Sequence, residues 1–271
     1  MKIFFDTEFT EGTQPRWKFW KTKPTIDLIS IGMVNEVNHK YYAVSNEFNL
    51  KDAWNRYDIK TEEVFGDMRN IYPEGIKRKV YWIRENVLKP IWEELVKKEL
   101  AVDQLAELEY PFTYKGLKYL IKKYGKSNKV IAKEIEKFAA GYDAYGNHYD
   151  YLAWCGVELE KKPKFYAYYA DYDWVVFCWL FGKMNDLPSN FPQYCIDLKQ
   201  ELDLRVNSKR LYYHRDILGS PTTKDRLATF DEKLTMYNAS NDYPKETNAH
   251  NSLADAQWNK ELYEFIKNRL V

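Results

Sequence analysis

Apolar residues near the start of the chain gather in short segments that are separated by polar ones. Residues 3–9, 26–34 and 40–44 are rich in β-branched and aromatic side chains, and the polar stretch 35–39 joins the last two. Short apolar runs bounded by polar turns predict β-strands. We therefore expect an antiparallel three-stranded meander, with residues 10–24 as a polar and aromatic excursion outside the strands.

The chain changes character between about 50 and 140. Apolar positions recur there at every third or fourth residue, with Lys and Glu between them, which predicts a helical stretch. One helix is expected over residues 130–138. Ser127 and Asn128 are both suitable N-caps for it, and Gly141 is its expected end.

Strands and helices alternate in the second half of the chain. Residues 163–170 read as a strand that feeds a helix over 174–184, and residues 194–198 as a short strand entering another helix. The last helix should cover 252–270. Its expected buried face consists of Leu253, Ala256, Leu262, Phe265 and Ile266.

This order of elements predicts a layered α/β fold with a mixed sheet flanked by helices. We expect a single domain over residues 1–271 with insertions at about 50–125, 141–162 and 205–245. The last two insertions are polar and have few periodic apolar positions, so no role for them follows from the sequence.

Composition and charge narrow the class of protein. The chain is 45% hydrophobic and 30% charged with a net charge of +1, which is typical of a globular protein and leaves room for only a local basic groove. The longest apolar run, residues 174–181, is far shorter than the roughly 18 residues of a membrane span. Asp6 and Glu8 interrupt any secretion signal. We expect a cytoplasmic protein without a membrane partner.

Cysteines and aromatic residues add two smaller expectations. Cys155, Cys178 and Cys195 are odd in number and lack a C-x-x-C pair, which predicts free thiols and no disulfide framework or zinc knuckle. The nine Trp, 23 Tyr and 14 Phe exceed what a core of this size needs. Some of these rings can therefore stack on nucleic-acid bases, although most are expected at the margins of the core.

Two carboxylates stand on the first predicted strand. Asp6 and Glu8 are two positions apart and so lie on one face, while the opposite face carries Ile3, Phe5, Thr7 and Phe9. Adjacent anions repel one another unless a cation lies between them. The same spacing recurs at Glu134 and Glu136, where a solvated face explains it; only the first pair lies on an otherwise apolar strand.

Further oxygen ligands are available for a Mg²⁺ or Mn²⁺ site. Asp173 follows the strand of residues 163–170, and Asp255 lies on the last helix, although each can also be read as a helix cap or an exposed acid. His250 precedes Asp255 by five residues. An imidazole with a pKa near 6.5 can take a proton from a water at neutral pH, while a lone histidine is more often a polar loop residue.

Taken in order, these motifs resemble those of the DEDDh 3'-to-5' exonucleases, a group that includes RNase T, oligoribonuclease and proofreading subunits. The resemblance rests on Asp6-x-Glu8, Tyr172-Asp173 and His250-x4-Asp255. The segments 5–9, 26–32 and 41–48 are further similar to a small bacterial exoribonuclease family opening with DTEF. The resemblance as a whole covers the first 50 residues, roughly 163–200, and 248 to the end, with a patchy match at 82–88.

Two assignments follow from the family pattern. The third carboxylate comes directly after an aromatic residue at a helix start, which favours Asp173 and leaves Asp171 as the expected cap. In the related group with a tyrosine base, that tyrosine lies four residues before the last aspartate. Asn251 occupies this position here, so the histidine subgroup is favoured.

The resemblance implies an RNase H-like fold and a metal-dependent 3'-5' exoribonuclease. Asp6, Glu8, Asp173 and Asp255 would hold two Mg²⁺ or Mn²⁺ ions, and His250 would deprotonate the attacking water. The products would be nucleoside 5'-monophosphates. The terminal nucleotide would contact Phe9 and Thr7. Single-stranded RNA or RNA 3' overhangs are the implied partners, and a homodimer is compatible with the family.

Two other functions remain open at this stage. The same chemistry fits a 3'-5' exodeoxyribonuclease acting on DNA ends, and a nucleic-acid-binding module without turnover could keep the fold alone. Two basic segments flank this plan. Residues 16–23 combine cations with rings, as a single-strand path or a solvated loop would, and the lysines of residues 115–129 read as an ordinary exposed helix face.

Overall fold

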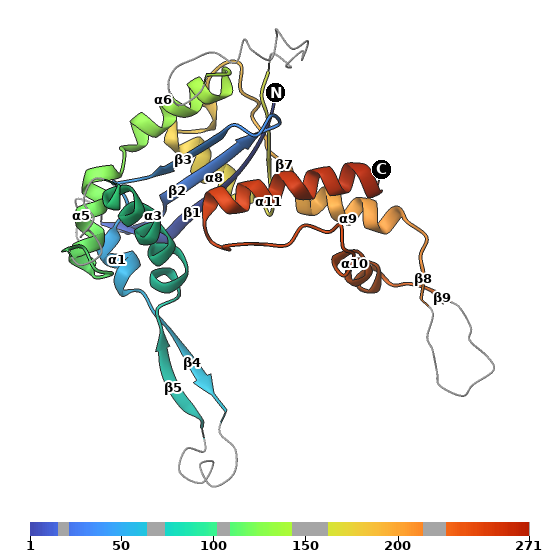
Figure 1. Ribbon diagram of the computed structural model, residues 1–271, viewed down its shortest axis with the longest axis horizontal. Coiled ribbons are helices and arrows are strands. Elements are labelled where there is room, and N and C mark those ends of the chain that lie inside the picture. The colour runs from blue at the N-terminus through green and yellow to red at the C-terminus, as the bar shows by residue number, and fades with distance from the viewer. Residues whose placement is uncertain (16–21, 64–73, 102–108, 143–161, 214–225, 271) are drawn as a thin grey trace.

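A five-stranded mixed sheet forms the centre of the computed structural model, which describes residues 1–15, 22–63, 74–101, 109–142, 162–213 and 226–270 (Figure 1). The strand order is β3-β2-β1-β6-β7. The first three strands pair antiparallel, whereas β6 pairs parallel with both β1 and β7. The strands are β1 (Lys2–Pro15), β2 (Thr22–Asn35), β3 (Lys40–Val44), β6 (Lys164–Ala167) and β7 (Ile196–Asp197).

The expected meander is confirmed, but the expected excursion over residues 10–24 is wrong. β1 and β2 keep pairing within that range, from Thr10 opposite Asp27 to Pro15 opposite Thr22. The side chains there are polar, so hydrophobic patterning could not reveal these strands. Their backbone groups are satisfied by the ladder whatever the side chains are.

Helices cover both sides of the sheet. The hydroxyl of Ser127 accepts from the Val130 amide, so of the two candidate caps the structure uses Ser127. The last helix begins at Ser252 as expected and continues through a π-helical turn, Ile266–Leu270. The α-helices are α1 (Leu50–Asn55), α3 (Lys89–Leu100), α5 (Tyr114–Tyr124), α6 (Asn128–Ala139), α8 (Asp171–Leu180), α9 (Leu198–Ser208), α10 (Phe230–Asn238) and α11 (Ser252–Phe265).

The predicted helical stretch contains a hairpin that the sequence did not reveal. β4 (Asp58–Glu62) and β5 (Ile76–Val80) pair antiparallel and project away from the body of the molecule (Figure 1). Every residue of β4 and the three central residues of β5 are exposed, so the hairpin has no buried apolar face that patterning could reveal. A π-helical turn, Arg84–Leu88, then leads into α3. A smaller pair, β8 (Tyr212–Tyr213) and β9 (Arg226–Leu227), lies in the third insertion.

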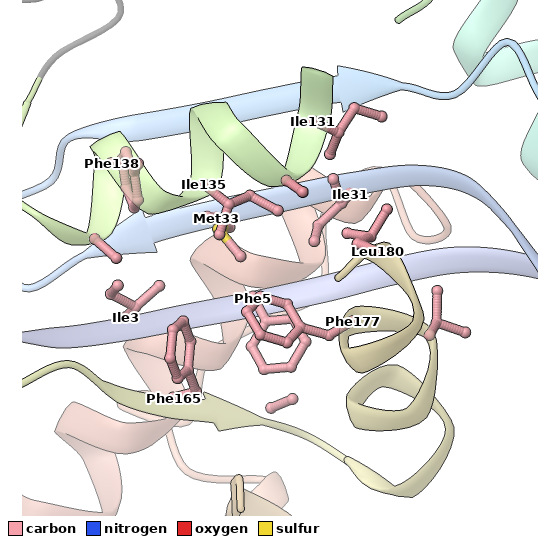
Figure 2. Packing of buried hydrophobic residues seen from close by; sticks show 14 of the residues in the cluster. Ile3, Phe5, Ile31, Met33, Ile131, Ile135, Phe138, Phe165, Phe177 and Leu180 are labelled. Carbon is pink, nitrogen blue, oxygen red and sulfur yellow. The ribbon is translucent and has the colours of Figure 1, made fainter. Parts of the chain in front are cut away.

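The two faces of β1 belong to different layers of the core. Ile3 and Phe5 pack with residues of α6 and α8, among them Ile135 and Phe177 (Figure 2). Phe4 belongs to the opposite layer, with residues of α9 and α11. Because side chains alternate along a strand, Thr7 continues the α8 side, and Asp6 and Glu8 continue the α11 side. A third cluster joins β2 and β3 to α1, α3 and α5.

α11 lies unusually close to β2. A Cβ atom on Gly32 would come within 2.3 Å of the backbone of Ser252 and Leu253, so glycine is needed there. The hydroxyls of Ser30 and Ser252 are 3.1 Å apart, and the Asn259 amide donates to the Phe5 carbonyl at 2.9 Å. These contacts fix the N-terminal end of α11 above the carboxylates of β1.

Several smaller expectations can be compared with the described residues. Cys178 and Cys195 are free thiols, while Cys155 and most of the insertion at 141–162 lie outside the described ranges. Among the helices that the structure describes, none combines the length and the apolar character that a membrane crossing requires.

Candidate active site

Three of the predicted carboxylates come together at one edge of the sheet. Asp6 and Glu8 extend from β1, and Asp255 extends from the first turn of α11. One carboxylate oxygen from each lies within 4.8 Å of the others. The register of β1 against β2 shifts between Glu8 and Phe9, because Glu8 lies opposite Ser30 and Phe9 lies opposite Leu28, so the regular pairing is interrupted directly after the acidic pair.

Burial and mutual repulsion make these carboxylates weak acids. Burial raises the pKa of Asp6 well above its usual value, and the nearby charges of Asp173, Glu8 and Asp255 raise it further. Burial, then Asp255 and Asp173, raise the pKa of Glu8 to about 8. Burial raises the pKa of Asp255 to about 7, although its hydrogen bond from the His250 amide opposes the change. The ionised cluster is therefore costly unless positive charge accompanies it.

Asp173 lies beside this group but is oriented by β1. It is 6% exposed, and one of its oxygens accepts from the Thr7 amide at 2.9 Å and from the Thr7 hydroxyl at 2.5 Å. Burial raises its pKa to about 6, although the bonds from Thr7 oppose the shift. Asp173 is not one of the three residues whose oxygens lie within 4.8 Å, so its role as a ligand stays a prediction.

The prediction that Asp171 caps the helix is wrong. The N-cap of α8 is Ala170, and Asp171 already lies in the first helical turn with its side chain exposed. The Ala170 amide instead donates to Asp197 at 3.0 Å, and the other oxygen of Asp197 caps α9 by accepting from Lys199 and Gln200. The hydrogen bond from Ala170 reaches the end of β7, so it could not be read from the sequence around α8.

His250 is tied to the cluster through its backbone. Its amide donates to Asp255 at 3.0 Å, and its φ of +65° places it in the left-handed region. Non-glycine residues adopt this conformation at an energetic cost, so the surrounding contacts must hold it. Asn251 follows as the N-cap of α11 and accepts from the amides of Leu253 and Ala254.

Trp82 is a site residue that the sequence did not single out. Its ring lies 4.8 Å from the His250 ring, centroid to centroid, in an edge-to-face arrangement at 72°. Trp82 lies two residues after the last residue of β5 and is 40% exposed. The only available signal was its position at the start of segment 82–88, which resembles the exoribonuclease family.

A groove of about 260 Å³ adjoins the cluster. Phe9 and Trp82 line it, together with Ile83, Glu11, Arg56 and Asp58. The ring of Phe9 stacks on Tyr172 at 5.6 Å, so Phe9 is backed by a second aromatic residue from α8. Thr7 is 4% exposed, and its amide and hydroxyl both donate hydrogen bonds to Asp173. Its predicted contact with substrate therefore stays a prediction. Most of the basic segment 16–23 lies outside the described residues.

The sequence of this chain is similar to those of two proteins with a named activity. No family model matches the chain. Two curated relatives from Mycobacterium tuberculosis are each 27% identical over 200 residues, which is 74% of this chain and 73% of the relative. They are 3'-5' exoribonuclease Rv2179c of strain ATCC 25618 / H37Rv and 3'-5' exoribonuclease MT2234.1 of strain CDC 1551 / Oshkosh. The chain is thus a distant relative of proteins named as 3'-5' exoribonucleases.

Proposed function

We propose that this protein is a metal-dependent 3'-5' exoribonuclease of the DEDDh type, with an RNase H-like fold, that releases nucleoside 5'-monophosphates. The observation that carries the proposal is the convergence of Asp6, Glu8 and Asp255 within 4.8 Å, with His250 hydrogen-bonded to the last of them. The relatives named as exoribonucleases favour RNA over DNA as the polymer.

The acidic cluster fits hard divalent cations. Asp6, Glu8 and Asp255 would hold Mg²⁺ or Mn²⁺, and Asp173 would complete a two-ion site. The pKa of Glu8, raised to about 8, and the pKa of Asp255, raised to about 7, support this assignment because they reflect burial first and nearby negative charge second, and a bound cation would offset both. When bound, two such cations would stabilise the negative charge that develops on the scissile phosphodiester.

His250 is the proposed general base. Its imidazole is partly exposed, so it can take a proton from the attacking water and pass it to solvent. Its backbone is held by Asp255, and its ring lies against Trp82. We assign Trp82 the role of a positioning residue, because the edge-to-face contact restricts rotation of the imidazole.

The groove beside the cluster would receive the terminal nucleotide. Phe9 and Trp82 both line it with aromatic rings, and stacking on such rings tolerates every base. Tyr172 supports Phe9 from behind, which would keep its face available. The groove is therefore suited to holding a 3' end, with the scissile bond directed at the carboxylates.

Hydrolysis of labelled oligonucleotides tests the proposal. Single-stranded RNA and DNA of one sequence, each labelled at the 5' end, would be incubated with Mg²⁺, Mn²⁺ or EDTA. We expect a ladder shortening from the 3' end of RNA with either metal and no reaction in EDTA. Preferential DNA cleavage would favour the exodeoxyribonuclease, and intact polymers under every condition would leave only a binding module.

The His250→Ala variant tests the assignment of the base. We expect turnover to fall by about 10² or more, which is the scale of a lost general base, while Mn²⁺ binding measured by calorimetry persists. Full activity in this variant would show that another group accepts the proton.

A further inference from the structure

A second cavity lies between α1 and α5, away from the carboxylates. It has a volume of about 420 Å³ and is lined by Asn46, Phe48, Asn49, Leu50, Lys51, Tyr114, Lys118, Ile121 and Lys122. The lining contains three lysines and no acidic residue. The groove beside the active site differs in this respect, because Glu11 and Asp58 offset its one arginine.

The three lysines carry charge that no carboxylate in the described part of the chain neutralises. Lys118 and Lys122 lie one turn apart on α5, a spacing at which like charges repel, and Lys51 adds a third cation from α1. Lys123, their neighbour on the same helix, shows the contrast: it pairs with Glu99 at 2.6 Å. An ordinary solvated face of α5 would not explain why Lys51 of α1 lines the same cavity as Lys118 and Lys122.

The cavity is connected to the active site by two elements. Glu8 pairs with Ser30, and Ser30 pairs with Val44, the last residue of β3. Two strand spacings place Val44 roughly 10 Å from Glu8. Asn46, only two residues farther, lines the cavity.

α1 provides the second connection. Its first residues, Leu50 and Lys51, line the cavity, and Arg56 directly after its last residue lines the groove beside Phe9. At 1.5 Å per residue, the two ends of this helix are about 8 Å apart. A strand whose 3' end lies in the groove can therefore reach the cavity within a few nucleotides.

We propose that this cavity binds phosphates of the RNA strand upstream of its 3' end. Lys51, Lys118 and Lys122 supply the charge, Asn46 and Asn49 supply amide groups for hydrogen bonds to phosphate and sugar, and Tyr114 offers a ring for stacking. This inference rests on the proposed function for the identity of the polymer. It assigns a role to Lys118 and Lys122, which the sequence analysis interprets as part of an ordinary exposed helix face.

The test compares binding of long and short RNA. Fluorescence anisotropy would use a labelled 16-nucleotide single-stranded RNA and the Asp6→Asn protein, which is expected not to degrade it. We expect Lys51→Ala/Lys118→Ala/Lys122→Ala to weaken binding by about 10-fold or more. Because single-stranded binding falls with salt by about 0.7 per phosphate neutralised, the slope of log K against log salt should drop by about 2.

A matched control separates a site from diffuse attraction. Lys115→Ala/Lys133→Ala/Lys137→Ala removes the same charge from exposed positions of α5 and α6 that do not line the cavity. We expect this triple variant to change affinity less than twofold. An equal loss in both triple variants would overturn the proposal. Replacing the three cavity lysines with Arg should keep the affinity and would exclude misfolding as the cause.

Hydrolysis of a dinucleotide distinguishes failure of this inference from failure of the proposed function. The one phosphate of a dinucleotide is the scissile one, so no upstream phosphate is left for the cavity; the triple-alanine variant with Asp6 intact should therefore cleave it at the wild-type rate and lose efficiency only on the 16-mer. Normal binding and cleavage of the 16-mer by that variant would overturn the inference and leave the exoribonuclease. Lysine-dependent binding without hydrolysis of any RNA would support the binding site and overturn the function.

Discussion

Thr7 gives both of its donors to one oxygen of Asp173, the amide at 2.9 Å and the hydroxyl at 2.5 Å. The two residues are far apart in the sequence, and their contact joins the central strand to the start of α8. It fixes the position of Asp173 relative to Asp6 and Glu8, which precede and follow Thr7 on the same strand. β1 therefore positions the acidic site from both of its faces. Asp6 and Glu8 extend from one face, and Thr7 on the other face holds Asp173.

Thr7→Val should disturb Asp173 without changing the shape of the core. The substitution removes a hydrogen bond to a buried carboxylate, and such bonds contribute about 1.5–3 kcal/mol. We expect the free energy of unfolding to fall by about this amount and turnover to fall with it. Urea denaturation and steady-state kinetics measure the two effects. Thr7→Ser keeps the hydroxyl and serves as the control; equal behaviour of both variants would argue against a role for this bond.

Asp173→Asn should abolish turnover, whereas Asp171→Asn should leave it largely intact. Asp173 is buried beside the cluster and its charge acts on Asp6 and Glu8, while the side chain of Asp171 is exposed in the first turn of α8. Single-turnover cleavage of a labelled RNA compares the two variants directly. If Asp171→Asn proved to be the inactive one, the assignment of the third carboxylate would be reversed.

Trp82→Ala should lower turnover by about 10-fold, because His250 loses the ring that limits its rotation. Trp179→Ala is the matched control, since Trp179 is 47% exposed on α8 and lines neither the groove nor the cluster. A double-mutant cycle is the decisive measurement. Once His250 is already alanine, Trp82→Ala should reduce turnover little further. Fully additive losses would mean that Trp82 acts only through the groove.

The stability of the metal-free protein should decrease as the pH rises. Folding raises the pKa of Glu8 to about 8 and of Asp255 to about 7, above unfolded values near 4. A raised folded pKa means that the folded state binds more protons, so its contribution is fully present below the unfolded pKa and is lost as pH rises through the folded pKa.

Thermal unfolding in EDTA between pH 5 and pH 9 measures this effect. We expect the melting temperature to fall across the interval and Mn²⁺ to raise it most at the alkaline end, because the cation binds the ionised cluster. Glu8→Gln should flatten the decline in EDTA. An unchanged pH slope in that variant would show that the cluster does not govern stability.

Gly32→Ala should disrupt the site from a distance. The added Cβ would meet backbone atoms of Ser252 and Leu253 at 2.3 Å, and backbone cannot move aside as a flexible side chain can. Overpacking of this kind costs about 1–3 kcal/mol and would displace the start of α11, which carries Asp255. Gly12→Ala is the control, because the nearest atom to its Cβ would be 3.5 Å away. Equal urea midpoints for the two variants would contradict the close packing.

Local chemistry in the sequence determined much of this protein. Alternation of side chains placed Asp6 and Glu8 on one face of β1 and Ile3 and Phe5 on the other, as the structure confirms. Helical periodicity located the last helix, and capping preference narrowed the N-cap of α6 to Ser127 or Asn128. Each of these properties depends on residues within a few positions of one another, so a single sequence contains the information.

Tertiary structure alone decided how distant segments meet. The Thr7–Asp173 bond, the contact of Trp82 with His250 and the lysine-lined cavity between α1 and α5 all join residues remote in sequence. The exposed β4–β5 hairpin and the hydrogen bond from the Ala170 amide to Asp197 likewise left no local pattern. Their positions depend on how helices pack on the sheet, and packing is a property of the whole chain, because each contact requires the surfaces that others have already brought together.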